Sequence, residues 1–437
     1  MTNKELMNED LKYIWHPCTQ MKDHEFLPLI PIKSGEGVYL EDFEGNRYID
    51  AVSSWWVNIL GHNNKFINNY IKNQVDTLEH VLLAGFTHKP AIDLAKKLVE
   101  ITPKGLDKVF FADNGSSAIE VALKMSFQYY KNKGKTKPNF VSLENSYHGE
   151  TIAALSISDM GLYKDVYEEI LIQSIKTSSP KDQSEEESLR ALNELEKLLK
   201  IKADEISAVI IEPLVQCAGS MSMYSPSFIV GLRKLCTQYD VLFIADEVAV
   251  GFGRTGKLFA CEHANVSPDL MILSKGLTGG YLPLSVVMIP DFIYDEFYCD
   301  YADYKRAFLH SHSYTGNALC CSAALGTIAY LEENDIINKN QEKIAFINDE
   351  LQKFKNLPNV KEVRQTGMIA AVELQGYKSE DRIGLEVYKY GLKNGVLLRP
   401  LAHIIYFMPP YVINKEEIKK MIDTAYEAIK KLPKTNQ

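Results

Sequence analysis

The sequence predicts an α/β protein with a mostly parallel β-sheet that helices cover on both faces. Short apolar runs recur along residues 90–275, polar or turn residues flank each run, and stretches with helical spacing separate them. The predicted strands are residues 109–112, 140–143, 208–211, 241–245 and 270–273. Ligands of such sheets bind beyond the carboxyl ends of the strands, so the polar residues that follow these runs are the first candidates for a site.

The two ends of the chain follow a different pattern. Residues 37–50 predict a hairpin of two short strands with Gly45 and Asn46 at the turn. After about Thr327 the chain becomes lysine-rich and helical, and it then predicts strands at 369–374 and 396–399 and a final helix near 415–431. We expect this C-terminal region to form a second, smaller α+β domain.

Segment 177–187 is the clearest predicted loop, because polar and charged residues dominate it. The helix after it is expected to pack through leucines at helical spacing. These are Leu189, Leu192, Leu195, Leu198 and Leu199. We expect no function here beyond a solvated connection and a packed helix.

Length and charge limit the class of protein. A chain of 437 residues can hold one large α/β domain and a smaller companion. Its formal net charge of −9 argues against a nucleic-acid or membrane surface, so small molecules and other protein subunits are the expected partners. The chain has no N-terminal apolar signal, no run of roughly 18 apolar residues, and seven cysteines without a CxxC pair. These features predict a soluble, cytoplasmic protein.

An acid and a lysine follow two successive predicted strands. Asp246 closes the run 241–245, and Lys275 comes just after the run 270–273. Pyridoxal phosphate enzymes need this pairing, because a lysine holds the cofactor aldehyde as a Schiff base and a carboxylate keeps the ring nitrogen protonated. Acids and lysines also occur at strand ends without a cofactor, so other sites must decide between the two interpretations.

Small polar residues between a predicted strand and a helix offer a phosphate site. Residues 113–117 (Asp-Asn-Gly-Ser-Ser) follow the first strand and open an amphipathic helix. Backbone N–H groups and the helix dipole favour an anion there, which makes Gly115 and Ser116 candidates for phosphate binding. The alternative is an ordinary helix cap, because Asn and Ser are preferred caps in any helix.

Three more strand ends carry candidate side chains. Residues 147–150 (Tyr-His-Gly-Glu) follow the second strand, and the ring of Tyr147 could cover one face of a flat cofactor. Glu212 and Gln216 follow the third strand, although a Glu-Pro pair there can simply end the strand without a role in function. Arg399 ends a later strand and is a candidate for pairing with a substrate carboxylate, the alternative being a surface arginine.

Residues 251–256 (Gly-Phe-Gly-Arg-Thr-Gly) match the GxGxxG fingerprint of dinucleotide-binding proteins. That fingerprint should open an amphipathic helix, whereas these residues soon lead to Pro268. We therefore expect the glycines to shape a loop, with a nicotinamide-dependent oxidoreductase as a weak alternative. No metal site is expected, because the Cys-Glu-His at 261–263 and the His-Ser-His at 310–312 lack a partner cluster at zinc spacing.

Taken together, the motifs resemble those of the class III aminotransferases, which are pyridoxal phosphate enzymes of fold type I. The matching segments are 211–213 (Ile-Glu-Pro), 245–248 (Ala-Asp-Glu-Val), 251–256, 274–276 (Ser-Lys-Gly) and 316–317 (Gly-Asn). The resemblance implies a large domain at residues 61–327 with a mostly parallel sheet of the seven-stranded type. It also implies a smaller α+β domain from both termini, residues 1–60 and 328–437.

Within this family, further motifs resemble the members that convert 8-amino-7-oxononanoate to 7,8-diaminononanoate in biotin biosynthesis by a ping-pong mechanism. These motifs are 15–17 (Trp-His-Pro), 53–58 (Ser-Ser-Trp-Trp-Val-Asn), 147–150, 399–400 (Arg-Pro) and 408–410 (Met-Pro-Pro). The resemblance makes Lys275 the Schiff-base lysine, Asp246 the partner of the pyridine nitrogen, and Tyr147 the ring that stacks on the cofactor.

The resemblance assigns the remaining site residues as well. Gly115 and Ser116 would hold the phosphate, while His312 and Ser313 would cross a homodimer interface to complete the phosphate site of the other subunit. The substrate site would consist of Cys18, Trp55, Trp56, Tyr147, Lys275, Ser311 and Arg399, with Arg399 as the anchor of the substrate carboxylate.

Two departures from the family pattern bear on the amino donor. Cys18 replaces a tyrosine, and residues 311–313 (Ser-His-Ser) replace Gly-Pro-Thr, as in members that use lysine as donor. The pair Trp55 and Trp56 resembles the S-adenosylmethionine branch, which we favour. Open alternatives are lysine as donor, another class III enzyme such as an ornithine or GABA aminotransferase or an aminomutase, and a binding or regulatory protein without the chemistry.

Overall fold

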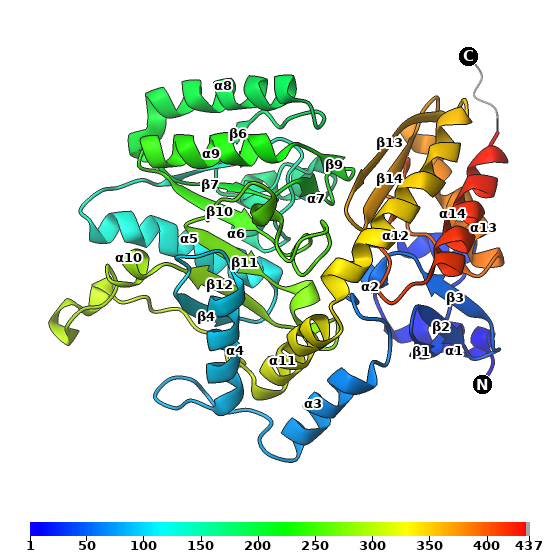
Figure 1. Cartoon of the computed structure of the whole chain (residues 1–437), viewed down its shortest axis with the longest axis horizontal. Helices are drawn as coiled ribbons and strands as arrows, with labels where there is room; N and C mark the ends of the chain where they lie inside the picture. Colours follow the sequence, from blue (N-terminus) through cyan, green and yellow to red (C-terminus); the bar gives the residue numbers. More distant parts are fainter. Residues whose placement is uncertain (434–437) are drawn as a thin grey trace. The chain divides into compact units, whose positions relative to one another are not determined.

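The computed structural model describes residues 1–433, which fold into two compact units (Figure 1). Unit 1 consists of residues 1–65, 342–364 and the chain from Met368 onward, and unit 2 consists of residues 66–341 and 365–367. Unit 1 therefore takes its segments from both ends of the chain. These boundaries lie later in the chain than the domain limits at residues 60 and 327, which stay a prediction.

Unit 2 is built on a seven-stranded sheet in the order β4-β12-β11-β10-β7-β5-β6. The strands are β4 (Lys108–Ala112), β5 (Asn139–Leu143), β6 (Ile175–Thr177), β7 (Ile206–Ile211), β10 (Leu242–Asp246), β11 (Leu270–Leu273) and β12 (Ser285–Ile289). Neighbours from β11 to β6 pair in parallel, and β12 pairs antiparallel with both β11 and β4. The predicted α/β class with a mostly parallel sheet is confirmed.

All five strands predicted for this sheet are present, but the sequence analysis misses β6 and β12. Strand β6 has three residues, too few to show a period of two. Strand β12 is buried along its whole length, so it shows no alternation either. Its run Ser-Val-Val-Met-Ile is a signal that could have revealed it, although it comes soon after the glycine-rich segment 276–280.

Helix α5 (Gly115–Asn132) covers one face of this sheet and confirms the helix predicted after residues 113–117. The strand residues that meet it recur at every second position, among them Ile210, Ile244 and Ile272. Burial of each such side chain contributes about 1.5–3 kcal/mol. The other helices that follow the first segment of unit 1 are α3 (Lys65–Val75), α4 (Lys89–Ile101), α6 (Ile152–Ile157), α7 (Gly161–Lys164), α8 (Glu185–Lys202), α9 (Pro226–Gln238), α10 (Asp291–Tyr294) and α11 (Ala318–Glu333).

Helix α8 packs along α9 on the same unit (Figure 1). Leu195 and Leu199 are buried as predicted, but Leu189 is 59% exposed, so its predicted place on the packed face is wrong. The buried face continues from the two leucines through Ala191 to Ser188. A small polar residue therefore takes the position at which the leucine pattern suggested a larger one.

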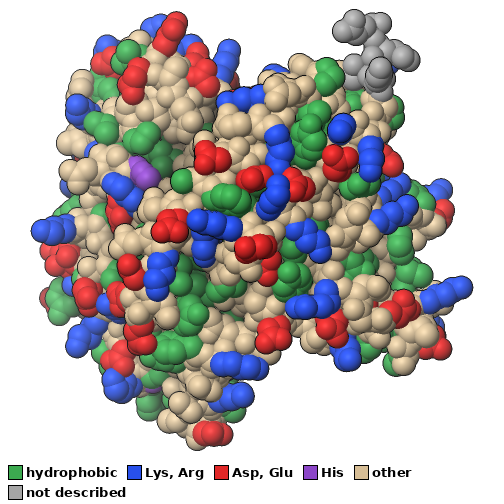
Figure 2. Space-filling view, turned by 45° about the vertical axis from the view of Figure 1, so that its right-hand side comes forward, with side chains coloured by type: hydrophobic (Ala, Val, Ile, Leu, Met, Phe, Trp, Pro, Cys, Tyr) green, Lys and Arg blue, Asp and Glu red, His purple; other side chains and the backbone are tan. Residues whose placement is uncertain are grey.

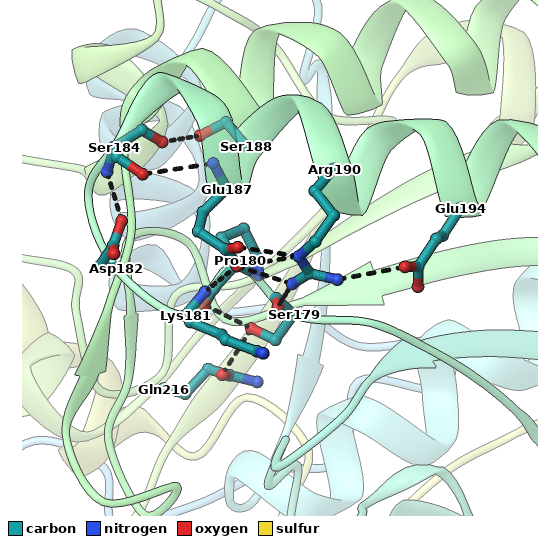
Figure 3. A network of polar contacts seen from close by, with 10 residues as sticks. All are labelled: Ser179, Pro180, Lys181, Asp182, Ser184, Glu187, Ser188, Arg190, Glu194 and Gln216. Carbon is teal, nitrogen blue, oxygen red and sulfur yellow. Dashed lines mark hydrogen bonds and ion pairs between the residues drawn. The ribbon is translucent and has the colours of Figure 1, made fainter.

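The segment before α8 is held by a polar network centred on Arg190 (Figure 3). The Arg190 guanidinium donates to Glu187 at 2.8 Å and to the carbonyl oxygen of Ser179 at 2.7 Å. Ser179 Oγ in turn donates to Gln216 Oε1 at 2.9 Å, and Gln216 Nε2 donates to the Glu144 carbonyl at 2.8 Å. The predicted solvated connection is thus tied to the loops that follow β5 and β7.

Unit 1 contains two small sheets. One has the order β1-β2-β3-β15, with β1 (Ile32–Glu36), β2 (Tyr39–Asp42), β3 (Arg47–Asp50) and β15 (Val396–Leu397). The other comprises β13 (Val360–Thr366), β14 (Ile369–Leu374) and β16 (Ile404–Phe407). The predicted hairpin is confirmed as β2 and β3, and Gly45 in its turn has a φ of +86°. Strand β15 pairs in parallel with β3, which joins the two ends of the chain.

This part of the chain also contains helices. They are α1 (Asn3–Tyr13), the short α2 (Ser53–Trp56), α12 (Ile336–Leu351), α13 (Ile383–Lys393) and α14 (Lys415–Lys430), and the last confirms the predicted final helix. Two further short strands, β8 (Val215–Gln216) and β9 (Ser222–Met223), pair with each other in unit 2.

The glycine motif at residues 251–256 forms turns and opens no helix, as predicted. Gly253 and Gly256 have φ angles of +101° and +95°, which only glycine adopts without strain. The loop is closed by Glu247, whose carboxylate accepts the backbone N–H groups of Ala260 and Cys261, both at 2.8 Å. This geometry removes the structural basis of the nicotinamide alternative, because a dinucleotide fingerprint needs a helix there.

Acidic and basic side chains are interspersed on the face that Figure 2 shows. No helix among residues 1–433 is both long enough and apolar enough to cross a lipid bilayer.

We predict that Glu247→Gln flattens the dependence of stability on pH. Burial raises the pKa of Glu247 to about 7, although hydrogen bonds from Ala260 and Cys261 oppose the rise. The folded state therefore binds this proton more tightly than the unfolded chain, so the stabilisation is present below the ordinary pKa of about 4.5 and is lost as the pH rises through about 7. Urea titrations of the wild type should show the free energy of unfolding falling over this range by about 3 kcal/mol more than in the variant.

The slope with pH is the readout here, because the amide also loses one acceptor and lowers stability at every pH. Glu169→Gln, at an exposed position, is the control and should keep the wild-type slope. An unchanged slope in Glu247→Gln would contradict the prediction.

Candidate active site

Asp246 and Lys275 lie at the ends of two neighbouring parallel strands. Asp246 is the last residue of β10 and lies opposite Ile272 of β11, and Lys275 follows β11 by two residues. The backbone of Lys275 is left-handed, with a φ of +45°, which a non-glycine residue adopts only at a cost of about 1–2 kcal/mol. Strained backbone of this kind clusters at functional sites.

The amine of Lys275 lies among groups that change its protonation. Burial lowers the pKa of Lys275, while the charges of Cys217, Asp246 and Glu212 act in the opposite direction. A lysine with a lowered pKa has a larger neutral fraction and is a better nucleophile and base. The electrostatic coupling to Asp246 also places the two predicted catalytic groups in one environment.

The carboxylate of Asp246 is held from two sides. His148 Nδ1 lies 2.7 Å from Asp246 Oδ2, and the Val248 N–H donates to Oδ1 at 3.1 Å. The side chain of His148 is fully buried, and its backbone N–H donates to Ser158 Oγ. The Tyr-His-Gly-Glu motif is recognisable in the sequence, but the contact of His148 with Asp246 is not, because their separation in sequence gives no sign of it.

The start of α5 forms a tight cradle next to these residues. Asn114 caps the helix by accepting the N–H of Ser117 at 3.1 Å. A Cβ atom on Gly149 would lie 2.0 Å from Ser116 Oγ, and one on Gly115 would lie 3.0 Å from Val248. Glycine is therefore required at position 149 for the close approach of two loops, and the positive end of the α5 dipole is available for an anion.

Tyr147 is fixed through both its backbone and its ring. Its N–H donates to Glu212 Oε1 at 2.9 Å, and its hydroxyl donates to Glu150 Oε1 at 2.9 Å. The ring centre lies 5.6 Å from that of Tyr163, at an edge-to-face angle of 61°. Tyr147 and Gly149 thus belong to the loop that follows β5, and Gly149 brings this loop against Ser116 at the start of α5.

Glu212 links the loops after two adjacent strands. Its other oxygen accepts the N–H of Cys217 at 3.0 Å, so one carboxyl group joins residues 147 and 217. Burial raises the pKa of Glu212 to about 8, and the charge of Asp246 adds to the rise. The sequence analysis gives Glu212 a low weight, whereas the structure makes it a central support of this site.

In unit 1, the turn Ser53–Trp56 is left-handed throughout. Its four φ angles are +49°, +46°, +72° and +74°, and none of the residues is glycine. The Arg399 guanidinium carbon lies 4.1 Å from the centre of the Trp55 ring, a cation–π contact. Trp56 turns away into the core, where Nε1 donates to Tyr406 OH at 3.1 Å. Two predicted substrate residues, Trp55 and Arg399, are therefore in direct contact.

The segment 310–313 lies near the start of α5 through one ion pair. His312 Nδ1 is 3.6 Å from Asp113 Oδ2, and His312 Nε2 is 3.1 Å from His310 Nε2. The Ser313 carbonyl lies 2.8 Å from a ring nitrogen of His80. Ser311 belongs to the same segment. Cys18 is exposed, and its backbone has a φ of +51°.

Unit 2 thus gathers Gly115, Ser116, Tyr147, Asp246 and Lys275 at one edge of its sheet, and unit 1 brings Trp55 and Arg399 together. The side chain of Trp56, which was also predicted for the substrate site, is instead buried against Tyr406. The first group fits pyridoxal phosphate. A glycine-lined helix start suits the phosphate, a coupled lysine suits the aldehyde, and a fixed carboxylate suits a basic ring nitrogen. The buried His148 keeps the carboxylate of Asp246 in place.

Comparison with known proteins agrees with this geometry. The family model for aminotransferase class-III matches residues 20–429. The adenosylmethionine-8-amino-7-oxononanoate aminotransferase of Helicobacter pylori is 48% identical over 97% of this chain and 98% of that protein. A protein of the same name from Geobacter sulfurreducens is 41% identical over 97% of both chains.

Solved structures give the same result. The crystal structure of the adenosylmethionine-8-amino-7-oxononanoate aminotransferase from Methanocaldococcus jannaschii covers 98% of this chain and 99% of that one, with a TM-score of 0.94 and 40% identity. A transaminase from Virgibacillus superposes with a TM-score of 0.90 at 30% identity, over 97% of this chain and 98% of that one. The chain belongs to the class III aminotransferases, a family of pyridoxal phosphate-dependent transaminases of fold type I.

Proposed function

We propose that the protein transfers an amino group from S-adenosylmethionine to 8-amino-7-oxononanoate, giving 7,8-diaminononanoate in biotin biosynthesis, with pyridoxal phosphate as cofactor. The observation that carries this proposal is the Trp55–Arg399 contact, because an arginine stacked on an aromatic ring can bind the far carboxylate of the acceptor. The names of the Helicobacter and Geobacter relatives support the same reaction.

The cofactor, when bound, supplies an electron sink for carbanion chemistry. Lys275 holds it and then acts as the base, moving a proton from the α-carbon of the amino donor through its Nζ. The lowered pKa of Lys275 suits this role, since it leaves a larger fraction of the amine neutral and able to accept a proton. General base catalysis of this kind contributes about 10² to 10⁴ in rate.

Asp246 is proposed to keep the pyridine nitrogen protonated. Its carboxylate is already oriented by His148 and Val248, so little reorganisation is needed when the ring binds. Gly115 and Ser116 would bind the phosphate, and Tyr147 would stack on the ring. Glu212 supports Tyr147 from behind through its backbone.

We also propose a cytoplasmic homodimer in which His312 and Ser313 complete the phosphate site of the other subunit. The support is the family resemblance; within one chain, His312 lies close to Asp113 at the start of α5. Ser311 and Cys18 would line the donor side of the substrate site. All seven cysteines are free thiols, which fits a reducing compartment.

The first prediction concerns Lys275. The purified protein should absorb visible light from its bound cofactor, and Lys275→Ala should lose that absorption and essentially all transamination, because no other group can replace the amine. Lys202→Ala, on the surface of α8, should keep both properties. A wild type that stays colourless with added pyridoxal phosphate would refute the cofactor assignment.

The second prediction concerns the donor. In a single half-reaction, S-adenosylmethionine should bleach the visible band of the wild type, and lysine should leave it unchanged. The family departures at Cys18 and at residues 311–313 make lysine the competing donor. Bleaching by lysine alone, measured under the same conditions, would replace S-adenosylmethionine in the proposal.

The third prediction concerns the acceptor. Arg399→Ala should raise KM for 8-amino-7-oxononanoate roughly 10- to 100-fold, because a charge-assisted hydrogen bond contributes about 1.5–3 kcal/mol. Arg399→Lys keeps the charge but loses the planar fork and should show a smaller rise. Arg382→Lys, which pairs with Asp23 elsewhere in unit 1, serves as control. An unchanged KM in Arg399→Ala would remove Arg399 from the substrate site.

A further inference from the structure

The left-handed turn Ser53–Trp56 needs support from outside its own backbone. Four consecutive non-glycine residues with φ between +46° and +74° are rare, because each Cβ atom crowds the neighbouring carbonyl in this conformation. Such a turn persists only where side-chain contacts stabilise it. The structure shows these contacts on one side of the turn.

A chain of four polar side chains ends on the turn. Asn58 Nδ2 lies 2.8 Å from His62 Nδ1, and His62 Nε2 lies 3.0 Å from Asp50 Oδ2. The same carboxylate oxygen accepts the hydroxyl of Ser54 at 2.7 Å. The Asn58 amide and the Asp50 carboxylate thus each contact one ring nitrogen of His62.

Asp50 is able to act as a fixed anion. It has no exposed surface, and burial alone would raise its pKa, yet the hydrogen bonds from His62 and Ser54 outweigh burial and lower it. Its other oxygen accepts the N–H of Val52 at 3.3 Å, directly before the turn. The Asp50 carboxylate therefore accepts hydrogen bonds from a backbone N–H group just before the turn and from a side-chain hydroxyl within it.

The turn separates the two tryptophans. Trp56 is only 4% exposed and is bonded to Tyr406, whereas Trp55 is 39% exposed and lies against Arg399. The parallel pairing of β3 with β15 sets this contact, because Leu397 lies opposite Asp50 and Arg399 follows two residues later. Asp50, which supports the turn, and Arg399, which contacts Trp55, are thus both positioned by the pairing of β3 with β15.

We infer that Asp50, His62 and Ser54 are positioning residues that hold Trp55 against Arg399 and thereby set the affinity for the carboxylate of the amino acceptor. They touch neither substrate nor cofactor in this inference and act through Trp55. The inference rests on the proposed function in one respect, the assignment of Arg399 to a substrate carboxylate.

Ser54 offers a matched pair of variants. Ser54→Ala removes the hydroxyl and keeps the strained backbone, whereas Ser54→Gly removes the hydroxyl and relieves the strain, because glycine adopts positive φ freely. The chain has three tryptophans, so protein labelled with 5-fluorotryptophan should give three fluorine resonances, and Trp55→Phe assigns one of them. In Ser54→Ala and His62→Asn, the Trp55 resonance should broaden and shift while that of Trp56 stays in place. Ser54→Gly should show the smaller change.

Kinetics of the holoenzyme give the second readout. KM for 8-amino-7-oxononanoate should rise roughly 5- to 10-fold in Ser54→Ala and His62→Asn, with kcat within about twofold of the wild type and an unchanged donor half-reaction. A general loss of folding would instead lower kcat and the donor half-reaction as well. Ser220→Ala, an exposed serine with a φ of +60° in unit 2, is the control and should leave the Trp55 resonance unchanged.

Titration with nonanoate separates the two proposals. This carboxylate has an acyl chain and no reactive group, so its affinity, followed by the Trp55 resonance, does not depend on turnover. A 5- to 10-fold weaker binding in His62→Asn supports the inference even if the wild type fails to convert 8-amino-7-oxononanoate, which would refute only the proposed function. Wild-type binding, KM and Trp55 resonance in both Ser54→Ala and His62→Asn would overturn the inference. If Ser54→Ala fails to fold, His62→Asn decides in the same way.

Discussion

The arrangement of unit 2 depends on the buried contact between His148 and Asp246. A carboxylate at a strand end is ordinarily solvated and free to rotate, whereas here a ring nitrogen at 2.7 Å and a backbone N–H at 3.1 Å fix both of its oxygens. This contact joins the loop after β5 to the end of β10. Because Lys275 follows the adjacent β11, the fixed charge also defines the electrostatic environment of the lysine.

Two neighbouring carboxyl groups in this unit, Asp246 and Glu212, have different roles. Asp246 is a fixed anion. Burial and the nearby charge of Asp246 raise the pKa of Glu212, whose two oxygens accept the backbone N–H groups of Tyr147 and Cys217. Neighbouring acids with different surroundings commonly have different roles. The structure thus separates a fixed anion, which we propose as the partner of the cofactor ring, from a carboxyl group that holds the backbone of two loops.

Much of this site could be predicted from the sequence, because ligands of parallel sheets bind beyond the carboxyl ends of the strands. Asp246, Lys275, Tyr147 and the segment 113–117 each follow an apolar run. Contacts between separate loops could not be predicted from the sequence. Examples are the hydrogen bond of His148 to Asp246 and the close approach of Gly149 to Ser116. Strand β12 was missed because uniform burial hides its period, and Leu189 was misplaced because the packed face of α8 continues through a serine. The left-handed turn at Ser53–Trp56 gives no signal in residue type, because none of its members is glycine.

The parallel pairing of β3 with β15 has a consequence for the order of folding. Unit 2 is almost continuous in the chain, so a ribosome releases nearly all of it before the later segments of unit 1, which begin at residue 342, exist. Residues 1–65 must then wait, with β3 lacking its outer neighbour, until β15 has been synthesised. During translation, the N-terminal hairpin therefore exposes the unpaired edge of β3 for a long time. We expect a chaperone to bind this edge.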